Sequence, residues 1–240
     1  MKPVKPYSQE GSKKAQVASM FNAIAKRYDL LNRTLSLGID VIWRNITVKA
    51  VGKHQPIDLL DVATGTGDLA IALSHIPNSR IDGIDIAQGM LAVAQVKVEK
   101  KHLDDRITLT HGDGESLPYK DASYDAVTVA FGVRNFENLM PGLKEMRRVL
   151  RPDGQIAILE FSQPERFPIK QIYHVYFKVI LPVIGRLVSK DNAAYTYLPE
   201  SVDAFPYGQA FLDKLQEAGF RDLHHRPLTF GIATLYTAKK

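Results

Sequence analysis

Short apolar runs alternate with stretches of helical period through the middle of the chain. Each run is rich in β-branched and aliphatic residues and has turn residues nearby, as is typical of strands. The five runs cover residues 57–62, 80–85, 106–111, 124–130 and 155–161. Between them apolar residues recur every three or four positions, as in Leu139, Leu143, Met146 and Leu150. This alternation predicts an α/β fold with a parallel sheet and helices on both faces.

The two flanking regions depart from this alternation. Residues 1–53 read as helices, and residues 163–207 read as a helical insertion with an apolar stripe over 169–187, which Pro182 is expected to kink or end. A helix at 209–218 and strand-like runs at 221–226 and 229–238 close the chain.

We therefore expect a Rossmann-like sheet of seven strands, mostly parallel, with an antiparallel last strand. Residues 1–53 form a basic N-terminal arm and helical cap in this interpretation, and residues 54–240 form one domain that carries the insertion.

Composition narrows the chemistry. The chain has no cysteine, which excludes disulfides, a thiolate nucleophile and zinc sites that need sulfur, and we expect no metal centre. The N-terminus has no apolar segment typical of a signal peptide, and the chain has no uncharged apolar run of membrane-spanning length. These features predict an intracellular protein that does not cross a membrane.

Charge is placed unevenly along the chain. Residues 1–53 hold ten basic and three acidic side chains, a net charge of 10 − 3 = +7, and the remainder carries 21 − 23 = −2. A basic leader on a nearly neutral body favours attraction to an anionic surface, either phospholipid or nucleic acid. A solvated arm that only keeps the protein soluble is the alternative.

The loop after the first strand predicts a nucleotide-type ligand. Glycines in Asp61-Val-Ala-Thr-Gly65-Thr66-Gly67 allow a sharp turn and a close approach to the following helix. Asp85, followed by Ile86, ends the second strand and is placed to accept hydrogen bonds from ribose hydroxyls. Because the spacing Gly65-x-Gly67-x-x-Ala70 also satisfies the dinucleotide fingerprint, the loop by itself does not say which adenosine-type ligand binds.

Two further loops belong to the same predicted crevice. The third strand leads into Asp113-Gly114, where an adenine can be held, and the fourth strand ends at Ala130, just before Arg134 and Asn135. Ligands in open α/β sheets bind beyond the carboxyl ends of the strands, so these loops are expected to converge.

The loops after the first three strands resemble motifs I to III of class I S-adenosylmethionine-dependent methyltransferases. More specifically, the chain resembles the ubiquinone/menaquinone biosynthesis C-methyltransferase family from about residue 17 onward. The motifs that carry the resemblance are Phe21-Asn-x-Ile-Ala-x-Arg27-Tyr28-Asp29-x-x-Asn32, Ser36-x-Gly38-x-x-x-x-Trp43-Arg44, Asp61-x-Ala63-x-Gly65-Thr-Gly67-Asp68, Phe131-Gly-x-Arg134-Asn135 and Leu159-Glu160-Phe161-Ser162.

The resemblance implies methyl transfer from S-adenosylmethionine, without a metal, to a ring carbon of a polyprenylated quinol. Arg134 would stabilise the ionised quinol or orient a water, Asn135 would fix that geometry, and Tyr28 and Asp29 are further catalytic candidates in the cap. A structural role for Arg134, paired with Asp29 or Glu160, is the alternative. The sequence does not identify the general base, since the candidate His174 falls on the polar face of its helix.

Partners and location follow from the same resemblance. Tyr173, Tyr176 and Phe177 are candidates to line a channel for the prenyl tail or to lie in a membrane interface, although simple packing on the sheet is the alternative. We expect a cytoplasmic protein in transient contact with the anionic inner face of the membrane, no nucleic-acid partner, and a possible homodimer. Naphthoquinol and benzoquinol substrates are not distinguished.

Four other functions compete. Another small-molecule methyltransferase and a nicotinamide-dependent dehydrogenase both fit the glycine loop. A nucleic-acid methyltransferase fits the basic charge, but the fourth strand leads into Phe-Gly-Val-Arg-Asn and not into a Pro-Pro-aromatic turn. A peripheral lipid-binding module is the least favoured, because the full cofactor loop is retained.

Overall fold

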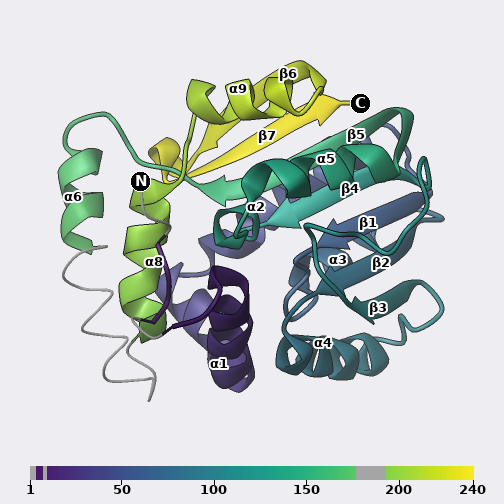
Figure 1. The fold of residues 1–240 in the computed structure, drawn as a ribbon, viewed down its shortest axis with the longest axis horizontal. Helices are drawn as coiled ribbons and strands as arrows, with labels where there is room; N and C mark the ends of the chain where they lie inside the picture. The colour runs from purple at the N-terminus through teal and green to yellow at the C-terminus, as the bar shows by residue number, and fades with distance from the viewer. Residues whose placement is uncertain (1–3, 8–9, 177–192) are drawn as a thin grey trace.

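The computed structural model describes residues 4–7, 10–176 and 193–240. Its centre is a sheet of seven strands in the order β3-β2-β1-β4-β5-β7-β6 (Figure 1). The strands are β1 (Asp58–Val62), β2 (Arg80–Asp85), β3 (Ile107–His111), β4 (Tyr124–Ala130), β5 (Leu150–Phe161), β6 (Arg221–Leu228) and β7 (Ala233–Lys239). Strand β7 runs antiparallel to both of its neighbours, and the other described pairs are parallel. The predicted mostly parallel sheet with an antiparallel last strand is confirmed.

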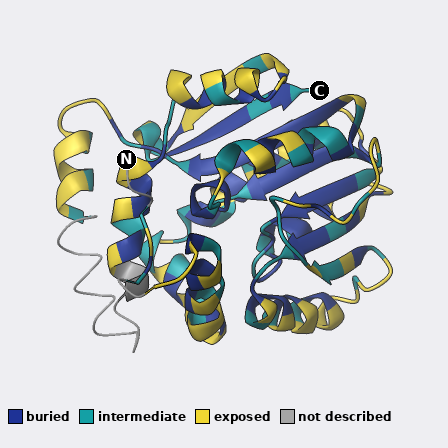
Figure 2. Cartoon of the chain, in the orientation of Figure 1, coloured by how far each residue is buried: buried dark blue, intermediate teal, exposed yellow. Residues whose placement is uncertain are grey.

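Helices cover both faces of the sheet. Helices α2 (Ile39–Gly52), α3 (Asp68–Leu73) and α4 (Gln88–Lys100) pack on one face, while α5 (Leu139–Val149) and α9 (Gln209–Glu217) pack on the other. The central strands are buried almost throughout, the edge strands β3 and β6 are largely half-buried or exposed, and most helices bury one side, as Figure 2 shows. This is the burial expected of a three-layer α/β fold.

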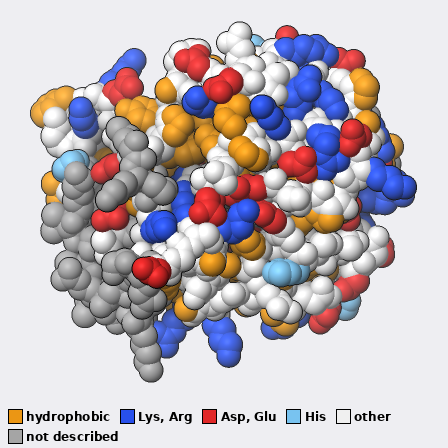
Figure 3. Space-filling model, in the orientation of Figure 1, with side chains coloured by type: hydrophobic (Ala, Val, Ile, Leu, Met, Phe, Trp, Pro, Cys, Tyr) orange, Lys and Arg blue, Asp and Glu red, His pale blue; other side chains and the backbone are white. Residues whose placement is uncertain are grey.

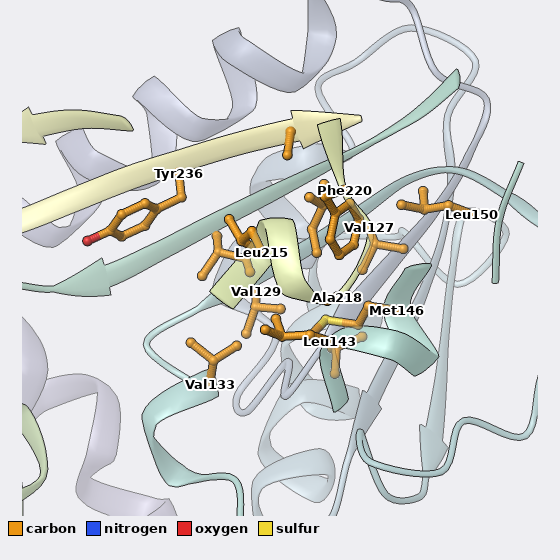
Figure 4. Packing of buried hydrophobic residues seen from close by; sticks show 14 of the residues in the cluster. Val127, Val129, Val133, Leu143, Met146, Leu150, Leu215, Ala218, Phe220 and Tyr236 are labelled. Atoms are coloured by element: carbon orange, nitrogen blue, oxygen red, sulfur yellow. The ribbon is translucent and has the colours of Figure 1, made fainter. Parts of the chain in front are cut away.

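Successive residues of a strand belong to the hydrophobic cores on opposite faces of the sheet, because side chains alternate between the two faces. On β1, Leu59 joins the core under α2 and α3, and the next residue, Leu60, joins the core under α5 and α9. Figure 4 shows this second core, in which Val127 and Val129 of β4 lie beside Leu143 of α5.

The N-terminal segment contains two helices with different tasks. Helix α1 (Lys13–Leu35) begins at Ser12, whose hydroxyl accepts the backbone N–H of Ala15, and it lies outside the sheet layers. It packs on α4 and on α8 (Ala193–Ala204). Helix α2 instead packs directly on the sheet through Trp43 and Val51. The segment 1–53 therefore includes a core helix as well as a cap.

The region 163–207 contains α6 (Ile169–Val175) and α8. The predicted kink at Pro182 and the apolar stripe beyond Tyr176, with Phe177, lie outside the described residues. Helix α6 has no buried residue, so packing on the sheet does not account for its described part.

Two strand boundaries differ from the prediction. Strand β5 starts earlier than predicted, at Leu150, because Leu150 already pairs with Tyr124. The turn-like sequence Arg151–Gly154 lies within the strand as a register shift, where Asp153 has a left-handed backbone conformation. Residues 229–231 form a 3-10 turn, η3 (Thr229–Gly231), in which Phe230 has a φ of 59°, so β7 begins only at Ala233.

Candidate active site

The glycine loop after β1 leaves the sheet in a left-handed conformation. Ala63, Gly65 and Gly67 have φ values of 53°, 58° and 78°. Gly67 then caps α3, so the loop directs backbone N–H groups toward the space above the sheet. The Ala63 side chain faces Gly132 in the loop after β4, where an added Cβ would lie 2.7 Å from the Ala63 Cβ.

Asp85 holds this loop in place. Its carboxylate accepts the backbone N–H of Gly65 and that of Ala87, both at 2.8 Å. Burial raises the pKa of Asp85, against the lowering effect of these two hydrogen bonds. The carboxylate thus fixes the glycine loop and also borders the crevice described next.

A crevice lined by both charged and apolar side chains lies over the carboxyl ends of β1 to β4. Four of the predicted cofactor residues line it, namely Asp85, Ile86, Asp113 and Gly114, together with the predicted catalytic Asn135. A side chain at Gly114 would lie 2.8 Å from Val62 and 2.9 Å from Phe136, so only glycine leaves this wall open. The amide oxygen of Asn135 is buried and accepts no hydrogen bond from the described residues.

The other predicted cofactor residues are not among the described residues that line the crevice. Asp61 is 1% exposed and accepts hydrogen bonds from Thr64 at 2.6 Å and Thr128 at 2.7 Å. Burial raises its pKa from 3.8 to about 6. Asp61 therefore stabilises the glycine loop from within the protein and does not line the crevice. Ala130 is half-buried at the end of β4. Gly65, Thr66 and Gly67 form the glycine loop itself.

The cap helix closes over the glycine loop through an ion network that the sequence analysis missed. The Thr66 hydroxyl donates to Asp29 of α1, and the Lys97 ammonium of α4 donates to Asp29 at 2.8 Å. Lys97 also pairs with Asp68 at the start of α3, which in turn accepts from Arg44 of α2 at 3.0 Å. Four helices thus meet at one group of charges beside the loop.

The start of α1 makes a second closure over the crevice. Lys14 pairs with Asp113 at 2.5 Å, and the buried Lys13 donates to the backbone carbonyls of Arg134 and Phe136 at 2.9 and 2.8 Å. Burial is the main cause that lowers the pKa of Lys13 to about 8. Both lysines are sequence neighbours in α1 and hold loops that lie more than ninety positions away.

A larger, mostly apolar cavity of about 260 Å³ adjoins the crevice, and Phe21 lines both. Helices α1 and α2, the loop after β4, and α6 and α8 supply its walls. Among its lining residues are Tyr28, Trp43, Phe131, Phe161, Tyr173, Tyr176 and Tyr197. Tyr173 and Tyr176, predicted as channel residues, thus face this cavity, whereas Asp29 is not among its described lining residues.

Arg134 lies where the cavity and the crevice meet. Its guanidinium donates to the fully buried Glu160 at 2.8 Å and lies 5.3 Å from the centre of the Phe161 ring. The pairing with Glu160 that the sequence left open is therefore present. Its Nε is buried and has no hydrogen-bond partner among the described residues. Arg134 lines the apolar cavity and its neighbour Asn135 lines the crevice.

The remaining candidates are less central. Tyr28 lines the cavity, and burial raises the pKa of its hydroxyl, so it stays protonated near neutral pH. His174 is exposed on α6, and His224 and His225 are exposed on the edge strand β6. Among residues 4–7, 10–176 and 193–240, no three His, Asp or Glu side chains gather in a way that could hold a metal ion.

Solved structures show the same fold. The [4+2]-cyclase SpnF superposes with a TM-score of 0.72 at 17% identity, covering 95% of this chain and 96% of that one. A SAM-dependent methyltransferase from Aquifex aeolicus superposes with a TM-score of 0.56 at 21% identity, covering 76% and 81%. The architecture is thus that of class I methyltransferases.

Sequence relatives are much closer. A demethylmenaquinone methyltransferase of Bacteroides fragilis is 48% identical over 238 residues, which cover 99% of this chain and 97% of the relative. The ubiquinone/menaquinone biosynthesis C-methyltransferase UbiE of Citrifermentans bemidjiense is 47% identical over 227 residues, which cover 94% and 96%. A model of the ubiE/COQ5 methyltransferase family matches residues 9–240. The chain therefore belongs to the ubiE/COQ5 methyltransferase family.

Proposed function

We propose that the protein transfers the methyl group of S-adenosylmethionine to a ring carbon of a polyprenylated quinol. Its relatives carry the names demethylmenaquinone methyltransferase and ubiquinone/menaquinone biosynthesis C-methyltransferase. The observation that carries the proposal is the junction, at the neighbouring residues Arg134 and Asn135, of an apolar cavity with a crevice whose lining includes four charged side chains. One space suits a polar nucleoside and the other an isoprenoid quinol.

The crevice fits the cofactor chemically. Asp85 offers carboxylate oxygens for hydroxyl donors, and the open wall at Gly114 leaves room for a flat ring. The Asn135 amide oxygen is a buried acceptor without a donor among the described residues, so it suits a ligand that brings its own donors. When bound, S-adenosylmethionine supplies a methyl group that its sulfonium already activates.

In the proposed reaction a carbon–sulfur bond breaks, a carbon–carbon bond to the ring forms, and the ring carbon then loses its proton. The carbon is nucleophilic when a neighbouring ring hydroxyl is ionised. The guanidinium of Arg134 offers N–H donors and no acceptor, so it stabilises that negative charge and does not act as a base. Glu160 holds the guanidinium through NH1, and Nε is left without a hydrogen-bond partner among the described residues.

Tyr28 and Asp29 take different parts in this proposal. Tyr28 remains a hydrogen-bond donor in the cavity wall, because its raised pKa keeps the hydroxyl protonated. Asp29 holds the glycine loop and Lys97, and so it positions the cap over the cofactor. By closing the cap, this contact keeps water from the reacting atoms.

The prenyl tail has a route past α6 in this proposal. Tyr173 and Tyr176 line the cavity, while Phe167, Ile172 and Val175 of the same segment are exposed at 81%, 62% and 53%. Figure 2 shows that α6 is mostly exposed. An exposed apolar strip beside the cavity fits contact with a membrane that holds the tail. No described helix is both long and apolar enough to cross a membrane.

The basic N-terminal arm contributes less to such contact than its net charge of +7 indicates. Lys14, Arg33 and Arg44 form ion pairs with acidic side chains of the protein itself. Lys and Arg side chains are densest on the right of the view in Figure 3, on the side of the molecule away from α6. We therefore assign the membrane contact to the apolar strip. The homodimer and the cytoplasmic location remain predictions.

The experiment incubates the purified protein with S-adenosylmethionine and a prenylated naphthoquinol or benzoquinol, kept reduced under nitrogen. Mass spectrometry should find a product heavier by one methylene group, with S-adenosylhomocysteine in equal amount. The oxidised quinones should give no product, because they have no hydroxyl to ionise. Absence of transfer to both quinols by a folded protein that binds S-adenosylmethionine would overturn the proposal.

A further inference from the structure

Helix α8 places a buried tyrosine hydroxyl in the wall of the apolar cavity. Tyr197 is 3% exposed, packs against Val17, Met20 and Leu31 of α1, and lines the cavity. Its hydroxyl has no hydrogen-bond partner among the residues that the structure describes. A buried hydroxyl without a partner is costly, because it has lost its bonds to water without replacement. Such a group is therefore expected to find its partner in a ligand.

Arg134, which lines the same cavity, carries a second unpaired donor. The guanidinium of Arg134 uses its NH1 group for Glu160 and for the Phe131 carbonyl, and its Nε is buried without a partner among the described residues. The surrounding walls are mostly aromatic and aliphatic, and Asn32, Ser36, Asp40 and Arg44 add polar groups to them. A mostly apolar cavity with two unpaired donors suits a flat apolar ligand that carries oxygen atoms.

The electrostatics of Tyr197 make it a donor and not a base. Burial raises the pKa of its hydroxyl to about 12; the charge of Arg134 opposes this rise and that of Glu160 adds to it. Both charged groups therefore act on the Tyr197 hydroxyl across the cavity wall. Near neutral pH the phenol keeps its proton and can donate it in a hydrogen bond.

We infer that the Tyr197 hydroxyl donates a hydrogen bond to a ring oxygen of the quinol and, together with Arg134, positions the ring against the cofactor crevice. The inference rests on the proposed function and assigns a positioning residue to its substrate. It predicts that the ring is held by two donors from different parts of the chain, one in η1 (Val133–Asn135) and one in α8.

The test replaces Tyr197 by phenylalanine and measures binding of two probes by anaerobic calorimetry. One probe is a prenylated 1,4-naphthohydroquinone, and the other is the same prenylated naphthalene without oxygen atoms. Y197F should bind the hydroquinone about tenfold more weakly, which is the loss expected for one hydrogen bond. It should bind the oxygen-free probe as wild type does. Equal weakening for both probes, or for neither, would overturn the inference.

Stability provides a second readout. Because the Tyr197 hydroxyl makes no protein hydrogen bond in the described structure, Y197F should keep or raise the melting temperature while kcat/KM for the quinol falls. The matched control is Tyr236→Phe, since the buried Tyr236 hydroxyl accepts the backbone N–H of Gly208 at 2.8 Å outside the cavity. That variant should lose melting temperature and keep kcat/KM. A Y197F variant with lower stability and unchanged kcat/KM would contradict the assignment.

Failure of the underlying function is distinguishable. If wild type binds neither probe and methylates neither quinol class, the proposed function fails, and the assignment of Tyr197 fails with it. If wild type methylates the quinol and Y197F does so equally well at low substrate, only the role of Tyr197 is wrong.

Discussion

The Thr66 hydroxyl and the Asp29 carboxylate lie 2.5 Å apart, which ties the cap helix α1 directly to the glycine loop. Lys97 bonds to the other oxygen of the same carboxylate. Since α1 also lines the apolar cavity, this contact joins the glycine loop to a wall of that cavity. Occupancy of the crevice is therefore expected to affect the shape of the cavity.

A double-mutant cycle on Asp29 and Thr66 tests this tie. Asp29→Asn and Thr66→Val should each lower the unfolding free energy, and the double variant should lose less than the sum, with a coupling of about 1.5–3 kcal/mol for a hydrogen bond to a charged group. Urea denaturation of the four proteins measures the coupling.

Turnover of the same variants separates positioning from acid–base catalysis. If Asp29 acts by holding Thr66, Thr66→Val should reproduce most of the loss of turnover seen in Asp29→Asn. A loss confined to Asp29→Asn, with a changed pH profile, would make Asp29 a catalytic base instead.

Arg134→Lys should lower turnover by roughly 100- to 1000-fold while leaving the affinity for S-adenosylmethionine nearly unchanged. Lysine keeps the charge but not the planar fork that can bond Glu160 and a ligand at once. Steady-state kinetics with the quinol and calorimetry with the cofactor give the two numbers.

Glu160→Gln is the control for the structural part of this effect. It leaves the buried guanidinium without its counter-charge, and breaking a buried pair typically costs about 3–5 kcal/mol of stability. A melting temperature that falls in both variants, with normal turnover in Arg134→Lys, would make Arg134 a structural residue only.

Asp85→Ala should weaken S-adenosylmethionine binding at least about tenfold, since it removes charged acceptors that border the crevice. Asp85→Asn retains one acceptor and should fall between the variant and wild type. Equilibrium dialysis measures the affinities, and circular dichroism checks that the loop held by Asp85 still folds. Wild-type affinity in a folded Asp85→Ala protein would place the ribose elsewhere.

Asp61 makes stability depend on pH in a defined window. With a pKa raised from 3.8 to about 6, the folded protein keeps a proton between about pH 4 and pH 6 that the unfolded chain has released. Raising the pH through this window therefore favours unfolding, by up to about 1.4 kcal/mol per pH unit. Relative to Asp61→Asn, wild type should lose unfolding free energy from pH 4 to pH 6 and change little above. A constant difference across this range would show that Asp61 titrates normally.

The sequence predicted the sheet well because its central strands are apolar runs that both helical layers bury. Leu59 and Leu60 illustrate this, since these adjacent residues pack into the cores on opposite faces of the sheet. The start of β5 was missed because the residues at 151–154 have the composition of a turn, and only pairing with β4 keeps the strand extended there.

The candidate site was predictable where a motif has local geometry. Asp85 and Gly114 reach the crevice because strand ends converge at one edge of the sheet. Lys97 and Tyr197 were not predictable, since their roles depend on partners far away in the chain and their own surroundings look like ordinary helix. Asp61 has the residue type of a ligand contact, but it is buried beneath the glycine loop. There its two carboxylate oxygens accept hydrogen bonds from Thr64 and Thr128.

The contact between Ala63 and Gly132 limits how the two loops can evolve. An added Cβ at Gly132 would lie 2.7 Å from that of Ala63 and 2.9 Å from Val129, so the two loops together have space for a single methyl group. Substitutions at these two positions are therefore epistatic. Alanine at position 132 becomes tolerable only with glycine at 63 and some yielding of Val129, and neither position can be judged from its own loop alone.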